Sequence, residues 1–235
     1  MSIPLFLAMT SQEIRENICQ TGKIAYMACH FSPKGSGVTN LPENMPPTAM
    51  LILDDRIPYG GQSAEQLIAG LRASVERLGC QYVLLDFERP ATKQLQELSA
   101  AVAKGLPCPV AMPPEYARAL DCPLFLPSIP PYILPEDYLS PYKNREIWLE
   151  AALDGALATV TAEGCQVTAV PYPETAIPLH HSRELCCHYH MDITDKAARV
   201  TFLRTAEDIG PLLEVAEQYG AALAIGLHQE LSGIT

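Results

Sequence analysis

The chain has 235 residues, of which 48% are hydrophobic and 18% are charged. This balance is typical of a folded globular protein and argues against a disordered chain. Sixteen Lys and Arg against 27 Asp and Glu give a formal net charge of −11, so we expect neither nucleic acid nor an anionic membrane surface as a partner. No apolar run approaches the ~20 residues that a membrane-spanning helix needs, because charged residues or proline interrupt every candidate.

The N-terminal segment and the cysteines indicate the compartment. Residues 1–10 contain a short apolar run, but they have no basic region and no cleavage site of the A-x-A kind, so we expect a buried strand rather than a signal peptide. The eight cysteines form no C-x-x-C pair, and several lie in apolar, strand-like runs. We therefore expect a cytoplasmic protein with reduced and mostly buried thiols.

Apolar segments rich in β-branched residues recur eight times along the chain, and several of the stretches between them have helical periodicity. The clearest helix begins with a cap at Ser63 and ends at Gly79, and residues 92–104 and 206–219 repeat this pattern. Strands that alternate with helices in a chain of this length predict a single α/β domain with the (β/α)8 TIM-like barrel fold. The eight predicted strands are residues 4–9, 23–31, 49–54, 82–87, 108–112, 122–126, 147–153 and 222–227.

Residues 154–200 have a different pattern, in which polar and apolar residues alternate around turns. Segments 158–161 and 166–168 form one such pair, and segments 188–194 and 199–204 form another. Alternation of this kind predicts antiparallel hairpins. We interpret the segment as a small β-hairpin insertion before the last helix, within one barrel domain that spans residues 1–235.

Two carboxylates, Asp86 and Glu88, lie at the end of the fourth apolar strand. Side chains two apart on a strand point to the same side, so both are expected to face the barrel axis near its rim. A neighbouring like charge and apolar surroundings raise the pKa of a carboxyl group, and a proton retained near neutral pH allows general acid catalysis. The alternative is an ion pair with Arg89, Arg56 or Arg204 that closes the barrel mouth.

The run Asp86-Phe87-Glu88-Arg89-Pro90 resembles the end of the fourth barrel strand in glycoside hydrolase family 18, the chitinase-like hydrolases, which carry the pattern D-G-x-D-x-D-W-E-Y-P. The order of elements is also similar, including a β-rich insertion between strand seven and its helix. In that family the Glu donates a proton, and the Asp two residues before it holds the N-acetyl group of the substrate, whose carbonyl oxygen attacks the anomeric carbon. The resemblance implies an N-acetylhexosamine-containing glycan as substrate, Glu88 as proton donor and Asp86 as the orienting residue.

The sequence also departs from the family pattern. Leu84 stands where the family has its middle Asp, Gln81 stands where it has its first, and Gly226-Leu227 replaces the Trp that strand eight of the family carries. No Tyr-Asp pair follows the sixth strand. These differences favour a second hypothesis, a catalytically inactive barrel that binds a carbohydrate or a protein partner.

Five further residues are candidates for substrate binding at the rim. Asp54 and Asp55 end the third strand, where they either contact substrate or cap the loop. Glu150 lies in the apolar seventh strand, where a charge must be paired in a salt bridge or functional. His30 ends the second strand and is either a ligand contact or a satisfied polar residue, and Gln229 follows strand eight.

Residues 180–190 hold four of the six histidines and two cysteines, which raises the question of zinc. The spacing matches no common metal-binding pattern, so we predict no metal and no cofactor. A third hypothesis, a metal-dependent hydrolase, would combine these histidines with Asp54 or Asp86. Phosphate-loop, dinucleotide-binding and nucleophile-elbow motifs are absent. A carbohydrate is therefore the expected ligand, and the sequence leaves the oligomeric state open.

Overall fold

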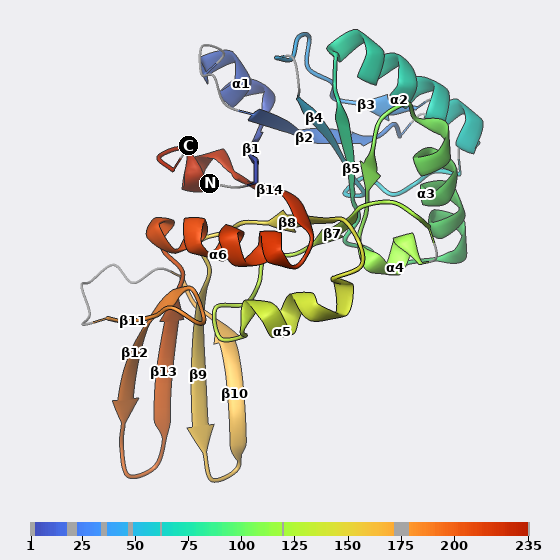
Figure 1. Ribbon diagram of the computed structural model, residues 1–235. Coiled ribbons are helices and arrows are strands. Elements are labelled where there is room, and N and C mark those ends of the chain that lie inside the picture. Colours follow the sequence, from blue (N-terminus) through green and yellow to red (C-terminus); the bar gives the residue numbers. More distant parts are fainter. Residues whose placement is uncertain are drawn as a thin grey trace.

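The computed structural model describes residues 3–17, 23–33, 37–46, 49–61, 63–118, 120–171 and 179–234. These residues form a parallel sheet curled into a barrel and a separate antiparallel sheet that projects from it (Figure 1). The predicted α/β barrel with a hairpin insertion is therefore confirmed.

Eight parallel strands form the barrel in the order β6-β5-β4-β2-β1-β14-β8-β7. The two ends of this sheet meet at a parallel bridge between Met112 and Leu124, where the Phe125 N–H donates to the Met112 carbonyl oxygen at 2.8 Å. Each strand overlaps one of the eight predicted from sequence, although β6, β7 and β8 are shorter than predicted. The barrel strands are β1 (Leu5–Met9), β2 (Lys23–Phe31), β4 (Met50–Asp54), β5 (Tyr82–Asp86), β6 (Val110–Ala111), β7 (Leu124–Leu126), β8 (Ile147–Glu150) and β14 (Ala221–Leu227).

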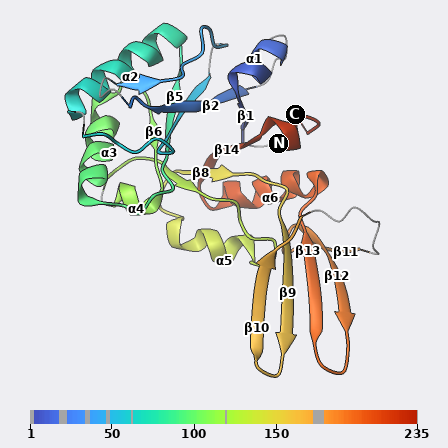
Figure 2. The ribbon, with the colours of Figure 1, turned by 180° about the vertical axis from the view of Figure 1, so that it is seen from behind.

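The helices of the barrel are unequal in length. α2 begins where the Ser63 side chain accepts the Gln66 N–H at 3.2 Å, and it ends at Gly79, whose φ of 67° is left-handed. α2 and α3 lie side by side on the outside of the barrel (Figure 2). Among the described residues between β2 and β4, the short strand β3 (Val38–Thr39) replaces a helix. The helices are α1 (Ser11–Asn17), α2 (Ala64–Leu78), α3 (Lys93–Gly105), α4 (Pro114–Ala117), α5 (Pro135–Leu139), the 3-10 turn η1 (Ser140–Tyr142), α6 (Ala206–Gln218) and α7 (His228–Leu231).

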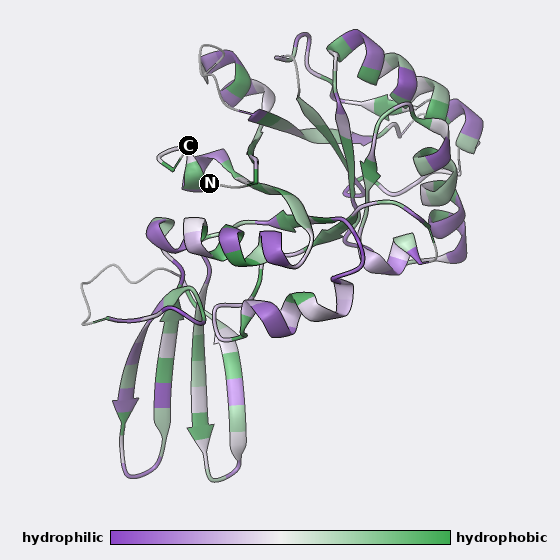
Figure 3. Ribbon diagram, viewed as in Figure 1, coloured by the Kyte–Doolittle hydropathy of each residue, from purple (hydrophilic) through white to green (hydrophobic). Residues whose placement is uncertain are grey.

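None of these helices combines the length and the apolar character that crossing a bilayer requires, within the part of the chain that the structure describes. Hydrophobic residues gather on the barrel strands, whereas hydrophilic stripes run along α2 and α3 (Figure 3).

The barrel strands bury apolar side chains on both faces. Outward-facing residues pack against the helices, and inward-facing residues fill the barrel axis. At the axis the Tyr82 ring packs edge-on to Trp148, with centroids 5.6 Å apart, and to Phe6, with centroids 5.4 Å apart. The interior is thus a packed core, and access for a ligand is limited to the two ends of the barrel.

The insertion is a five-stranded antiparallel sheet in the order β10-β9-β13-β12-β11. The pairing of β9 with β10 and of β12 with β13 confirms both predicted hairpins. The sheet ends at Leu203 rather than near residue 200, because β13 pairs with β9 as far as Gly155. The strands are β9 (Gly155–Thr161), β10 (Gly164–Ala169), β11 (His180–Ser182), β12 (Cys187–Ile193) and β13 (Ala198–Leu203).

Seven cysteines lie in the described part of the chain, and each is a free thiol. Cys29, Cys80, Cys186 and Cys187 are buried, and Cys165 is exposed. Burial raises the pKa of the Cys29 thiol and raises that of Cys187 to about 12, so these thiols stay protonated at neutral pH. The eighth cysteine, Cys19, lies outside the described residues.

Candidate active site at the barrel mouth

The carboxyl ends of the barrel strands form the mouth, and three of them end in inward-facing carboxylates: Asp54 on β4, Asp86 on β5 and Glu150 on β8. His30 on β2 pairs in register with Asp54. The alternation of side chains along a strand explains the arrangement, because each carboxylate lies two residues beyond an apolar residue of the barrel axis. Those three residues are Ile52, Leu84 and Trp148. The structure therefore brings four predicted site residues together on one rim.

Asp86 and Glu88 differ in their surroundings. Asp86 is half-buried, and this burial, followed by the charges of Glu88 and Glu150, raises its pKa to about 6. Glu88 lies in the loop just after β5 and is exposed. No ion pair within 4.0 Å joins either carboxylate to another described residue, so the alternative of a structural ion pair with an arginine is wrong.

Asp55 positions the loop that carries Glu88. It is 3% exposed, and its two carboxylate oxygens accept the backbone N–H groups of Glu88 at 3.1 Å and of Arg89 at 3.0 Å. The Arg89 Nε–H donates to the Asp55 carbonyl oxygen at 2.8 Å, and the Tyr116 hydroxyl donates to the Arg89 carbonyl oxygen at 2.5 Å. Of the two roles considered for Asp55, these contacts match loop capping. Arg89 and Tyr116 also hold this loop in place, and the sequence gave no reason to predict that role for either residue.

Asp54 is also bound by protein groups. Its Oδ1 lies 2.6 Å from His30 Nδ1 and accepts the Arg56 N–H at 3.1 Å, and its Oδ2 lies 3.6 Å from Arg56 Nε. The carboxylate is only 5% exposed. His30 and Asp54 thus form a braced pair at the rim, next to Asp86 on the neighbouring strand.

Glu150 forms the opposite part of the rim. Its Oε2 accepts the Ser128 N–H at 3.1 Å, and burial, together with neighbouring charges that include Asp154, raises its pKa. The Tyr138 hydroxyl donates to the carbonyl oxygen of Pro127, the residue before Ser128, at 3.3 Å. Burial, followed by the charges of Tyr142 and Glu150, raises the pKa of this phenol to about 12. No salt bridge to Glu150 occurs among the described residues. Tyr138 is a rim residue that the sequence gave no reason to select.

Gln229 belongs to a different part of the mouth. It is exposed on α7, and its side chain hydrogen-bonds Glu13 of α1. Leu227, at the inward-facing end of β14, is 40% exposed. An apolar side chain therefore stands where the resembled family carries its Trp.

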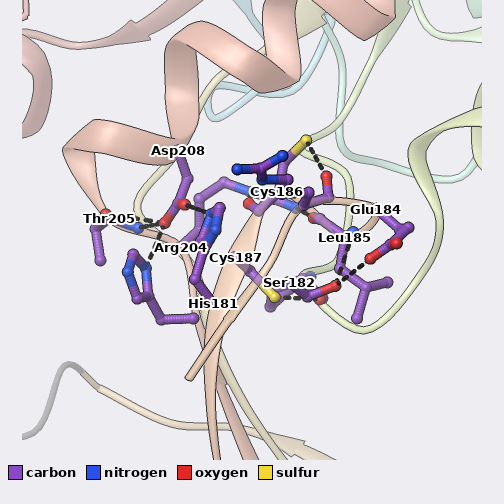
Figure 4. A network of polar contacts seen from close by, with 12 residues as sticks. His181, Ser182, Glu184, Leu185, Cys186, Cys187, Arg204, Thr205 and Asp208 are labelled. Atoms are coloured by element: carbon purple, nitrogen blue, oxygen red, sulfur yellow. Dashed lines mark hydrogen bonds and ion pairs between the residues drawn. The ribbon is translucent and has the colours of Figure 1, made fainter. Parts of the chain in front are cut away.

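The histidine-rich segment joins the insertion to the barrel. His181 Nε2 lies 3.1 Å from Asp208 Oδ1 and His188 Nδ1 lies 3.0 Å from Oδ2, and Asp208 also accepts the N–H and the hydroxyl of Thr205 at 2.8 Å (Figure 4). Asp208 lies in the first turn of α6. Within the described ranges, no group of three or more His, Cys, Asp or Glu is arranged to hold a metal ion. These histidines therefore hold the insertion sheet against α6.

Two cavities lie close to the barrel. One, of about 390 Å³, is lined by Cys80, Gln81 and Cys108 at the amino ends of β5 and β6, which is the end opposite the mouth. The other, of about 220 Å³, lies between the loop after β7 and the β9–β10 hairpin, and Ser128 and Asp154 line it. Ser128 donates to Glu150, so the second cavity adjoins the mouth.

Comparison with known proteins shows a similarity in fold. No protein-family model matches the sequence, and no curated protein matches it. Among solved structures, the chitinase from Chromobacterium violaceum ATCC 12472 is 14% identical, with 95% of this chain and 93% of that chain covered and a TM-score of 0.59.

Two further structures agree with the first. The GH18 chitinase from Cycas revoluta is 9% identical, with 98% and 97% of the chains covered and a TM-score of 0.59. The spore cortex-lytic enzyme SleL of Bacillus cereus is 11% identical, with 95% of this chain and 70% of that chain covered and a TM-score of 0.58. The chain thus shares the TIM-barrel fold of these chitinase-like enzymes.

Proposed function

We propose that this protein is a glycoside hydrolase that cleaves an N-acetylhexosamine-containing glycan, with Glu88 as the proton donor. The observation that carries the proposal is the position of Asp86 and Glu88. Asp86 ends β5, the fourth strand of a chitinase-like barrel, and Glu88 follows it, at the carboxyl-end mouth where TIM-barrel enzymes hold their active sites.

The surroundings of the two carboxylates suit different tasks. Glu88 is exposed on a loop that Asp55 braces, so it can reach a glycosidic oxygen and give it a proton. Asp86 is half-buried beside it, and above its pKa of about 6 it is an anion that can accept the N–H of an acetamido group. The acetamido carbonyl oxygen then attacks the anomeric carbon as the protonated leaving group departs. Water completes the reaction and gives a proton back to Glu88.

The choice of test substrates follows from the solved structures of similar fold. The Cycas revoluta GH18 chitinase was solved in complex with (GlcNAc)3, and the Nicotiana tobaccum class V chitinase E115Q mutant was solved with NAG4. Oligosaccharides of N-acetylglucosamine are therefore the first ligands to test.

The proposal is tested by asking whether turnover requires the acetamido group of the substrate. We expect the wild type to release a fluorescent aglycone from N-acetylglucosaminides of about one to three sugars, and not from the matched glucosides, because the attacking oxygen belongs to the acetamido group. Asp86→Asn should lower the rate on the N-acetylglucosaminides, whereas Glu65→Gln, an exposed change on α2, should leave it unaltered. Equal turnover of both sugar series would contradict this mechanism.

A barrel that binds a glycan without cleaving it is the second candidate. It is favoured by Leu84, which is 1% exposed and packed in the barrel axis at the position where the resembled family has its middle Asp. Binding of N-acetylglucosamine oligomers with no turnover of any glycoside would support this candidate over the first.

A further inference from the structure

The insertion sheet has two different faces. Residues that pair directly in an antiparallel sheet point to the same side, and so do residues two apart along each strand. One row of paired residues crosses β10, β9, β13 and β12 at mid-length, and it consists of Val167, Ala158, Val200 and Met191. All four are apolar, so the middle of this face is hydrophobic across four strands.

The rows on either side continue this face. The row nearer the hairpin turns consists of Cys165, Val160, Ala198 and Ile193. The row nearer the barrel consists of Ala169, Ala156, Phe202 and Tyr189. The three rows form what we call the apolar face, and none of their residues is charged.

The opposite face of the same strands is polar. One of its rows consists of Gln166, Thr159, Arg199 and Asp192, which pair across the sheet. An antiparallel sheet that alternates in this way normally buries its apolar face and exposes its polar face to water.

The apolar face is nevertheless exposed. Ile193 is 70% exposed and Met191 is 48% exposed, and Val160 and Val167 are exposed as well. These four side chains lie together on one face, whereas the described part of the chain exposes only two other large hydrophobic residues. Figures 1 and 2 show that the hairpin ends of the sheet project beyond the barrel and its helices. A cluster of exposed apolar side chains marks an interaction site.

The dimensions of the apolar face suit a protein interface. Three rows two residues apart extend about 20 Å along the strands, and four strands extend about 19 Å across them, which gives a flat area of about 400 Å². The accessible area is larger, because side chains stand out from the sheet. Tyr132 extends it at the barrel end, where its ring packs on Phe202 with centroids 6.3 Å apart. A specific interface needs about 600 to 800 Å² on each partner, so this face lies at the lower end of what a dimer requires.

Charge decides which partner fits. The chain carries a formal net charge of −11, so it repels an anionic membrane surface. A basic protein would be attracted to the chain as a whole, but the apolar face has no acidic side chain with which to bind it. A second copy of the chain brings a face that is equally apolar and uncharged, and depletion of charge is characteristic of the centre of homodimer interfaces.

We propose that the apolar face is a dimer interface, at which the insertion sheets of two copies of this chain pack against each other. Sheets that pack face to face interdigitate their side chains about 10 Å apart, as in a β-sandwich. Large side chains such as Ile193 alternate on this face with small ones such as Ala198, which leaves room for side chains of the other copy. A two-fold axis gives both copies the same contacts, and the interface area gives a dissociation constant in the range of about 1 to 100 μM.

The test is sedimentation equilibrium of the full chain at about 1 to 200 μM, with a reducing agent present so that the exposed Cys165 cannot cross-link two copies. We expect the mean mass to rise with concentration from 25.6 kDa toward twice that value. Added NaCl should strengthen the dimer, because it screens the repulsion between two chains of charge −11, whereas it would weaken a complex held by opposite charges.

Two neighbouring residues of β10 provide a matched pair of variants. Val167→Glu places a charge on the apolar face and should weaken the dimer at least tenfold, because two carboxylates would be buried in the interface. Thr168→Glu adds the same charge to the same exposed strand but on the polar face, and it should leave the dissociation constant within about twofold of the wild type. Ile193→Glu, on β12, should weaken the dimer as Val167→Glu does. All three positions are exposed, and circular dichroism would verify that each variant folds.

A wild type that stays monomeric at 200 μM would overturn the inference, and if it also bound phosphatidylcholine vesicles, the face would belong to a lipid surface. A dimer that Thr168→Glu weakens as much as Val167→Glu would contradict the choice of face. A dimer that withstands Ile193→Glu but not Val167→Glu would also overturn the inference, because it would indicate edge-to-edge pairing through β10.

Discussion

Asp208 joins the insertion sheet to the barrel, and its replacement by alanine should destabilise the protein strongly. The carboxylate is 1% exposed and contacts four groups: the N–H and hydroxyl of Thr205, and the rings of His181 and His188 (Figure 4). Loss of a helix N-terminal capping contact costs about 1 kcal/mol. Leaving a partly buried donor such as His188 unsatisfied adds about 1 to 3 kcal/mol, whereas His181 is 42% exposed and contributes little. The expected loss is about 3 kcal/mol.

The assay is thermal unfolding followed by circular dichroism at pH 7, where a loss of this size lowers Tm by roughly 6 to 12 °C in a protein of this length. Glu217→Ala, an exposed change on the same helix, is the matched control. Burial alone would raise the pKa of Asp208, but hydrogen bonds from Thr205 and His188 outweigh it and lower the pKa. The stabilisation is therefore present above the unfolded pKa of about 4 and is lost as pH falls through the folded value. If Asp208→Ala changed Tm at pH 7 no more than Glu217→Ala does, Asp208 would not hold the insertion sheet to the barrel as described.

Two further predictions concern the barrel itself. Burial, and then the charge of Glu88, raises the pKa of Asp86 to about 6, so this group stabilises the fold below its unfolded pKa of about 4 and loses that contribution as pH rises through 6. Asp86→Asn should therefore stabilise the protein by about 1 to 3 kcal/mol at pH 8 and hardly at all at pH 3.5, as measured by urea unfolding at the two pH values. An equal stabilisation at pH 8 and pH 3.5 would contradict the raised pKa. Trp148→Ala should destabilise by about 3 to 5 kcal/mol, because Trp148 is fully buried in the axis against Tyr82, and a loss below about 1 kcal/mol would show that the axis is not packed as described.

The elements that depend on local pattern were predictable from sequence. The helix between Ser63 and Gly79 has its cap, its apolar stripe and its left-handed terminus within one short segment, and all three are visible in the residues. The strand that ends at Asp86 is likewise a continuous apolar run, as strands buried on both faces require. Such features need no knowledge of distant residues.

The contacts that define the mouth could not be predicted in the same way. Asp55 caps the loop carrying Glu88 from just after β4, 33 residues away, and the Tyr138 hydroxyl reaches the rim from a short helix that no periodicity marks. The contacts of His181 and His188 with Asp208 likewise form only when the insertion packs on α6. These features depend on register and closure of the barrel, which a sequence pattern does not specify.

The most direct test of the proposed hydrolase is the kcat of Glu88→Gln on a fluorogenic N-acetylglucosaminide that the wild type cleaves. The substitution keeps the shape of the side chain and removes its proton, and Glu65→Gln serves as the matched control. We expect kcat to fall by a factor of about 10² to 10⁴ with KM little changed, as loss of a general acid predicts. A Glu88→Gln variant that retains wild-type kcat would contradict the assignment of Glu88 and, with it, the proposed active site at the end of β5.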